Sequence, residues 1–271
     1  MIEHLARRFD PLLTLGESLL LTLGENMYPQ LKATVRLLLG EQGEGMLLYL
    51  RRPKLGSEWG GPFNGQPFRR DLFLTIIKQL CPVAIVETGT YYGLTTNFMA
   101  QTKLPIFTIE GDPRKHGFAR ARLWRQRNVK LLLQDSRSAL HKLLEGPLSG
   151  LTSRRLFFYL DAHWTEDLPL AEELEIILSR CASPVIMIDD FQVPDDPGYA
   201  YDDYGSGKAL TPEYIAPAVK AHDLRAFYPA TRSSDEGGMR RGCVVLTKNI
   251  NDGQRLTAMP LLRTASDFRK L

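Results

Sequence analysis

The sequence has few cysteines and no long apolar run. Its three cysteines, Cys81, Cys181 and Cys243, form no Cys-x-x-Cys pair, so neither a disulfide framework nor a structural zinc site is indicated. The apolar stretch at residues 12–23 is interrupted by polar residues and a glycine. It lacks the unbroken apolar region of a signal peptide and the length of a membrane span. We therefore expect a cytoplasmic protein without a membrane segment.

An excess of one charge is also lacking. The 34 basic and 31 acidic residues give a formal net charge of +3, which is too small to indicate a nucleic-acid or membrane partner. Residues 114–130 nevertheless carry seven basic side chains and no acidic one. This segment could contact RNA or another polyanion. Its Phe118 and Leu123 favour a packed outer helix with a solvated basic face.

Short apolar runs recur from residue 82 onward and alternate with helical patterns. Such runs are typical of a parallel sheet that is covered on both faces. The runs lie at residues 83–86, 105–109, 129–133, 156–160 and 185–188. Between the last two, the apolar residues of 170–178 recur at helical spacing.

Two further strands are expected at residues 224–228 and 242–247. The link between them contains Gly237-Gly238 and no helical period, which favours an antiparallel hairpin at the sheet edge. The predicted fold is α/β, with a Rossmann-like, doubly wound, seven-stranded and mostly parallel sheet over residues 76–248. Residues 1–75 form a helical extension, with helices near 30–39 and 69–80 around a Gly- and Pro-rich loop at 53–67. This extension is a lid, a cap or a dimerisation arm, and the tail at 249–271 shows no clear pattern.

Polar residues follow each of the first three strands. The first strand runs into Glu87-Thr88-Gly89-Thr90-Tyr91-Tyr92-Gly93, where glycine lets the backbone approach a ligand. Glu110 ends the second strand, about 20 positions past the glycine turn, where an acidic residue can accept hydrogen bonds from ribose hydroxyls. Asp135 and Ser136 follow the third strand and can address an adenine edge. Two glycines alone are weak evidence, because a purely structural turn also contains them, whereas three polar strand ends point to a nucleoside pocket.

This pattern resembles the class I S-adenosylmethionine-dependent methyltransferases over residues 80–248. The resemblance implies S-adenosylmethionine as the cofactor. Tyr91 replaces the second glycine of the dinucleotide fingerprint, which disfavours NAD. The implied cofactor-binding residues are Glu87, Gly89, Thr90, Tyr91, Gly93, Glu110, Asp135 and Ser136.

Carboxylates follow the fourth and fifth strands. Asp161-Ala162-His163-Trp164 follows the fourth, and Asp189-Asp190 ends the fifth. Adjacent parallel strands lie about 4.8 Å apart, so these side chains are expected at one rim. Clustered carboxylates repel each other unless a cation compensates them, and oxygen ligands suit magnesium, manganese or calcium. Alternatively, the aspartates cap the following helices and loops. Asp189 and Asp190 would point to opposite faces of a regular strand, so only a bend could turn both inward.

The cluster is similar to the metal-dependent methyltransferases that modify macrolide sugars and aminocoumarins, and to the cephalosporin hydroxylase-like group. By this resemblance Asp161, Asp189 and Asp190 hold magnesium. His163-Trp164 and Ser183-Pro184 depart from the pattern and leave the substrate and the base open. A metal acidifies a bound alcohol, so we assign catalytic roles to Asp161 and His163. His163 is either the base, or a residue that supports the metal from outside its ligand set or packs the loop.

A long loop at residues 192–205 is rich in Pro, Gly, Tyr and Asp. Its tyrosines could stack on a sugar or aromatic acceptor, or it is an ordinary solvated loop. The sequence thus predicts a magnesium-assisted O-methyltransferase for a hydroxylated small molecule or glycan unit, with homo-oligomerisation open. Two alternatives stay open: a metal-independent methyltransferase for RNA or protein, and a cofactor-binding module without turnover.

Overall fold

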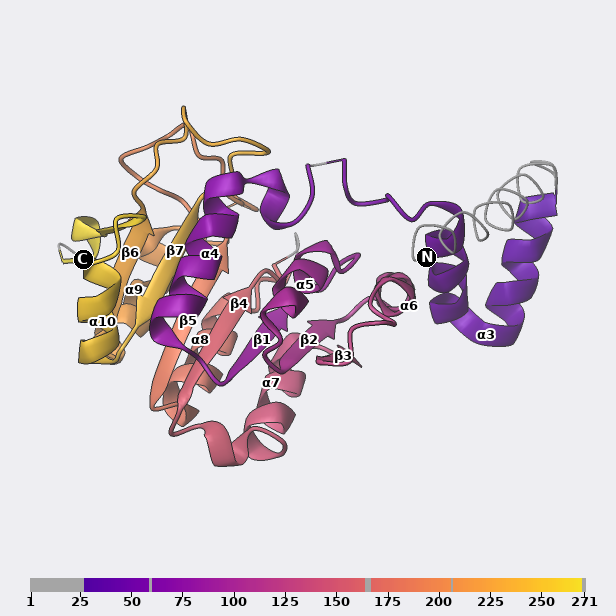
Figure 1. The fold of residues 1–271 in the computed structure, drawn as a ribbon, viewed down its shortest axis with the longest axis horizontal. Coiled ribbons are helices and arrows are strands. Elements are labelled where there is room, and N and C mark those ends of the chain that lie inside the picture. Colours follow the sequence, from indigo (N-terminus) through magenta and orange to yellow (C-terminus); the bar gives the residue numbers. More distant parts are fainter. Residues whose placement is uncertain (1–26, 59, 164–166, 206, 270–271) are drawn as a thin grey trace, which may run out of the picture.

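A computed structural model describes residues 27–58, 60–163, 167–205 and 207–269. These residues form one eight-stranded sheet in the order β3-β2-β1-β4-β5-β7-β6-β8 (Figure 1). The first five strands are parallel: β1 (Ala84–Thr88), β2 (Ile106–Glu110), β3 (Val129–Leu133), β4 (Arg155–Leu160) and β5 (Ser183–Asp189). Each remaining strand pairs antiparallel with its neighbours: β6 (Arg225–Pro229), β7 (Cys243–Thr247) and β8 (Leu262–Thr264).

The doubly wound α/β fold and its terminal antiparallel hairpin are confirmed, and each expected strand lies within two residues of its predicted bounds. The sheet has one strand more than the seven expected. The tail at 249–271 contributes α10 (Ile250–Thr257) and β8, which pairs with β6. Because β8 spans only three residues, it is too short to show a strand period in the sequence.

Helices cover both faces of the sheet. One face packs against α7 (Ser136–Glu145), α8 (Leu170–Arg180) and α9 (Pro212–Ala221), and the other packs against α4 (Pro67–Leu80), α5 (Leu94–Met99) and α10. Alternate strand residues enter the two cores, so Val86 faces the first and Ile85 faces the second. The described residues also form four short 3-10 helices: η1 (Phe63–Gly65), η2 (Ala100–Thr102), η3 (Ser149–Leu151) and η4 (Ser266–Arg269).

The N-terminal extension contains α3 (Met27–Arg51), which lies beside α6 (Pro113–Arg122) at one end of the sheet (Figure 1). The α3 helix is interrupted at Gly40, whose φ of 66° is not helical. A side chain at Gly45 would lie 1.9 Å from the Arg114 carbonyl oxygen, so the two helices are in backbone contact. The basic segment therefore begins inside a helix–helix interface, where Arg114 also pairs with Glu44 at 3.1 Å. No helix among the described residues has both the length and the apolar character needed to cross a membrane.

Candidate active site

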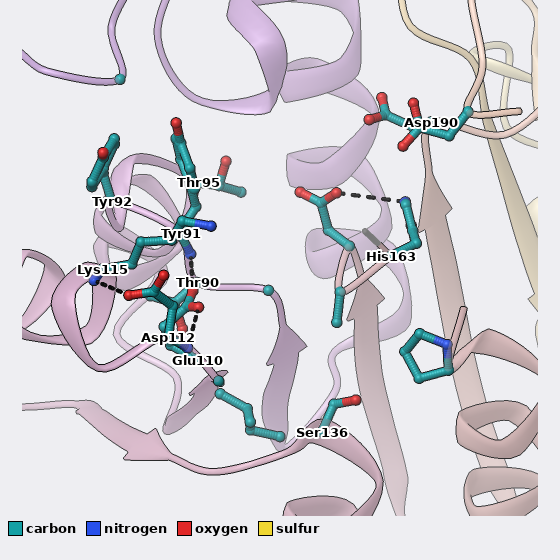
Figure 2. Close-up of a pocket in the computed structure, with 18 of the residues that line it drawn as sticks. Thr90, Tyr91, Tyr92, Thr95, Glu110, Asp112, Lys115, Ser136, His163 and Asp190 are labelled. Atoms are coloured by element: carbon teal, nitrogen blue, oxygen red, sulfur yellow. Dashed lines mark hydrogen bonds and ion pairs between the residues drawn. The ribbon is translucent and has the colours of Figure 1, made fainter. Parts of the chain in front are cut away.

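A cavity of about 800 Å³ lies at the carboxyl ends of the parallel strands. The strand order reverses between β1 and β4, which is where doubly wound sheets bind ligands. Figure 2 shows Tyr91 and Glu110 on one side of the cavity and His163 and Asp190 on the other. The lining therefore joins the predicted nucleoside end of the sheet to the predicted carboxylate cluster.

The turn after β1 is fixed by close backbone packing. Gly89 has a φ of 84°, and a Cβ there would lie 2.1 Å from the Asp161 carbonyl oxygen. Any other residue would push the turn away from the end of β4. Tyr91, also at positive φ (51°), donates its backbone N–H to Glu110 Oε2 at 2.6 Å. The turn is thus held against both neighbouring strands.

Glu110 lies in the cavity wall at the end of β2. Its Oε1 also accepts the Asp112 backbone N–H, at 2.9 Å. Burial raises the pKa of Glu110, opposed by these backbone hydrogen bonds from Asp112 and Tyr91. Two backbone donors therefore fix the orientation of the carboxylate and leave further lone pairs for a ligand diol.

Asp135 and Ser136 line the cavity beyond Glu110. Asp135 Oδ1 accepts the Ser138 backbone N–H at 3.1 Å and so caps α7. Its Oδ2 pairs with Arg137 at 2.8 Å, and the hydrogen bond from Arg137 contributes most to lowering the pKa of Asp135. Asp135 is therefore partly structural, yet it stands beside the cavity as the sequence predicts.

Two of the eight predicted cofactor residues, Glu87 and Gly93, do not line the cavity. Glu87 is buried beneath the turn and accepts hydrogen bonds from the Thr96 and Thr108 hydroxyls, each at 2.5 Å. Burial raises the pKa of Glu87 to about 7. Gly93 begins α5 in the left-handed region, and a Cβ there would meet Leu123 at 3.2 Å. Both residues support the turn and do not face the ligand space.

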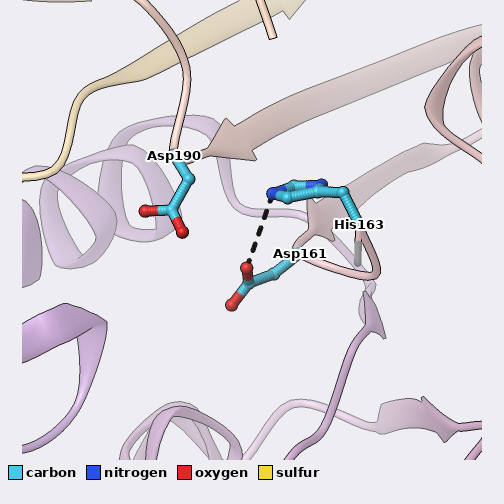
Figure 3. A group of neighbouring side chains, drawn as sticks. All are labelled: Asp161, His163 and Asp190. Carbon is cyan, nitrogen blue, oxygen red and sulfur yellow. Dashed lines mark ion pairs between the residues drawn. The ribbon is translucent and has the colours of Figure 1, made fainter. Parts of the chain in front are cut away.

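Asp161, His163 and Asp190 form a compact cluster at the other side (Figure 3). One ligand atom from each lies within 4.8 Å of the others, and His163 Nε2 is 3.7 Å from Asp161 Oδ1. His163 is buried, and burial lowers its pKa to about 4, so the ring is neutral at neutral pH. Burial, with Asp189 and Asp190 nearby, raises the pKa of Asp161 well above its usual range. Mutually repelling carboxylates beside a neutral imidazole suit a divalent cation.

Asp189, expected from the sequence as a third carboxylate ligand, lies beside this cluster but does not belong to it. Asp190 has a φ of 50°, and this bend turns its carboxylate toward the cavity. Asp189, the last residue of β5, is fully buried behind Asp190 and does not line the cavity. There it pairs with the buried Arg69 and accepts the Tyr159 hydroxyl. Side chains alternate along a strand, so Asp189 and Asp190 start on different faces. The bend at Asp190 turns that carboxylate toward the cavity and leaves Asp189 in the interior.

Several site residues carry no signal in the sequence. Asn64, in η1, donates through Nδ2 to Asp189 Oδ2 at 3.2 Å and to Asp190 Oδ1 at 3.3 Å. Arg241 Nε donates to Asp190 Oδ1 at 2.7 Å, and its guanidinium also pairs with Asp202. These contacts join residues far apart in the chain, and no local pattern predicts them.

The loop at 192–205 contributes to the cavity through Asp202 and Tyr204. The Tyr204 hydroxyl donates its hydrogen to the Asp202 carboxylate, and its oxygen also lies 3.3 Å from the His163 carbonyl oxygen, which is a second possible acceptor. The loop therefore contacts the His163 backbone from outside. Trp164, the next residue of the predicted motif, lies outside the described residues.

No protein-family model and no curated protein matches the chain. Among solved structures, the chain is similar to an O-methyltransferase from Bacillus cereus in complex with SAH. The TM-score is 0.50 at 14% identity, over 80% of this chain and 96% of that one. The O-methyltransferase TomG from Streptomyces achromogenes, in complex with SAM, gives a TM-score of 0.45 at 17% identity, over 67% and 79% of the two chains. The first likeness shows a shared fold, and the second is too weak to add to it.

Proposed function

Because the chain has the class I methyltransferase fold, we propose that it is an S-adenosylmethionine-dependent O-methyltransferase. Its acceptor would be a hydroxyl group of a small molecule or glycan unit. One observation carries the proposal: a single cavity joins the Glu110 carboxylate to the cluster of Asp161, His163 and Asp190. The cavity volume, about 800 Å³, falls within the usual range for ligand sites and leaves room for a cofactor and an acceptor.

The nucleoside end supports an adenosine-type cofactor. Glu110 is oriented by two backbone amides and can accept hydrogen bonds from both ribose hydroxyls. Asp135 and Ser136, one strand further, can contact the adenine edge. Tyr91 stands where a pyrophosphate would need a glycine, which favours S-adenosylmethionine over NAD.

The opposite end fits a divalent cation. His163 Nε2 is buried without a hydrogen-bond partner among the described residues, and two carboxylates with raised pKa values stand beside it. Asp161, His163 and Asp190 would hold the ion, for which the sequence predicts magnesium. When bound, such an ion acidifies an alcohol and so makes it a better nucleophile. The protein's own contribution is to place the acceptor hydroxyl beside the cofactor end of the same cavity.

The outer wall supports a polar acceptor. Asn64, Tyr204 and Arg241 line the cavity near Asp190. They already donate to neighbouring carboxylates, and what they retain for a ligand is the Asn64 amide oxygen, the Tyr204 hydroxyl oxygen and further guanidinium N–H groups of Arg241. Such groups recognise hydroxyl-rich molecules through directed hydrogen bonds. An aromatic ring and a sugar ring would both find partners here.

The test is methyl transfer from radiolabelled S-adenosylmethionine. Acceptors would be catechols, simple phenols and alkyl glycosides, assayed with EDTA and after addition of MgCl₂ or MnCl₂. We expect transfer to a hydroxyl acceptor, loss of transfer with EDTA and loss in Asp161→Asn. Asp195→Asn is the matched control, because Asp195 is exposed and pairs with Arg263 away from the cavity. Metal-independent transfer to RNA or protein would contradict the proposal, as would cofactor binding without transfer to any class of acceptor.

A further inference from the structure

The ligand set of the cluster excludes Asp189, because the charge of this carboxylate is already compensated by other residues. Its Oδ1 pairs with Arg69, and its Oδ2 accepts the Tyr159 hydroxyl and the Asn64 amide. Arg69 and Asp189 are both fully enclosed, so removing this carboxylate from its partner would leave a buried charge uncompensated. Asp189 is therefore a structural anion and is not available as a cation ligand.

The place of a third ligand is taken by a nitrogen atom. The His163 side chain is 2% exposed, and its Nε2 has no hydrogen-bond partner among the described residues. Nε2 is also the atom that approaches Asp161 (Figure 3). A buried ring nitrogen without a partner is costly unless a ligand meets it.

The two carboxylates have oxygen atoms to spare. Asp190 Oδ1 accepts from Asn64 and Arg241, whereas no described residue donates a hydrogen bond to its Oδ2. The Asp161 carboxylate likewise receives no hydrogen bond from the described part of the chain. Its side chain is 32% exposed, so it opens onto the cavity. Arg69, Asn64 and Arg241 thus hold the surrounding anions and leave these atoms for an ion.

We propose that this centre is a one-histidine, two-carboxylate site, formed by His163, Asp161 and Asp190, that binds a first-row transition ion in preference to magnesium. The inference rests on the proposed function for its biological role, and it gives His163 the role of a ligand in place of the base. Imidazole is a ligand for iron, nickel, copper and zinc, and the affinity of a site with mixed nitrogen and oxygen ligands rises along the first row from manganese through iron and cobalt. Magnesium favours oxygen ligands and retains its waters. The predicted all-oxygen set would have favoured magnesium.

Binding measurements on metal-free protein test the selectivity. Calorimetric titrations with MnCl₂, CoCl₂ and MgCl₂ should give at least about tenfold tighter binding of manganese and cobalt than of magnesium. Pulsed electron paramagnetic resonance of the manganese-loaded protein should show ¹⁴N modulation from a directly bound imidazole. His163→Gln should remove that modulation and weaken manganese binding about 100-fold or more, since even groups outside the ligand set cost 10- to 100-fold.

His141→Gln is the matched control, because His141 is exposed on α7 and does not line the cavity. It should bind manganese as the wild type does. The spectrum of the unaltered protein decides the question even if His163→Gln fails to fold. Manganese bound without ¹⁴N modulation, magnesium bound as tightly as manganese, or no ion bound at all would each overturn the inference.

Cofactor binding to the same samples separates this inference from the proposed function. If the manganese-treated protein binds S-adenosylmethionine but shows no nitrogen-ligated ion, the metal site is refuted and the methyltransferase proposal stays in place. A nitrogen-ligated ion without any cofactor binding would refute the proposed function and leave the metal site standing.

Discussion

Replacing Asp189 or Asp190 by asparagine should have opposite effects on stability and on metal binding. Asp189→Asn keeps the shape of the side chain but removes the charge that compensates Arg69 in the protein interior. Loss of one partner from a buried ion pair costs about 3–5 kcal/mol. We therefore expect the free energy of unfolding to fall by that amount. Since a domain is stabilised by only about 5–15 kcal/mol, this loss is large.

Asp190→Asn should leave stability almost unchanged. Asp190 pairs with Arg241, and both side chains are partly exposed at the cavity. Arg241 keeps its second partner, Asp202, and the substitution removes a negative charge next to Asp161. The net change should stay within about 1 kcal/mol. Metal binding, in contrast, should be lost in this variant because Asp190 is a proposed ligand.

Urea unfolding followed by circular dichroism, in buffer with EDTA, measures the first effect. Calorimetric titration with MnCl₂ measures metal binding by each variant, under conditions in which that variant is folded. The reverse pattern would refute the reasoning: a stable Asp189→Asn protein that no longer binds the ion, beside an unstable Asp190→Asn protein that still does. That result would restore Asp189 to the ligand set predicted from the sequence.

Three further substitutions test other parts of the structure. Glu110→Gln should weaken S-adenosylmethionine binding roughly 10- to 150-fold in calorimetry, since hydrogen bonds to a charged group contribute about 1.5–3 kcal/mol; unchanged affinity would place the ribose elsewhere. Gly89→Ala should lower the melting temperature measured by differential scanning fluorimetry, because its Cβ would lie 2.1 Å from the Asp161 carbonyl oxygen; a wild-type melting temperature would contradict this. Burial raises the pKa of Glu173 from 4.5 to about 7, so its carboxyl holds a proton longer in the folded state, and its contribution to stability falls as the pH rises from 4.5 through 7. In urea unfolding, Glu173→Gln should therefore be more stable than the wild type at pH 8, by at most about 3 kcal/mol, and equally stable near pH 4.5. The same difference in the free energy of unfolding at both pH values would refute the shifted pKa.

The strands β1, β2, β4 and β5 were predictable because each is almost wholly buried and reads as an apolar run. The edge strand β3 is only partly buried and contains Lys130, so its apolar residues alone indicated it. The strand β3 has its predicted bounds, and the polar residues after β1, β2 and β3 reach one cavity as expected. The end of the chain gave no such signal. The strand β8 is short and contains Arg263 and Thr264, so only its pairing with β6 makes it a strand.

The sequence predicts where the carboxylate cluster lies but not which residues form it. Strand alternation already separates Asp189 from Asp190, yet the bend at Asp190 depends on the fold around it. The partner of Asp189, Arg69, lies 120 positions away in the sequence. Asn64 is similarly remote, within a Gly- and Pro-rich loop. Such contacts between distant segments are set by tertiary packing, which local sequence patterns do not encode.

Calorimetry with S-adenosylmethionine and with NAD, each with MnCl₂ and with EDTA, tests most directly whether the cavity is a methyl-donor site. We predict one molecule of S-adenosylmethionine bound per chain and no heat of binding with NAD. Tight NAD binding without any response to S-adenosylmethionine would contradict the account.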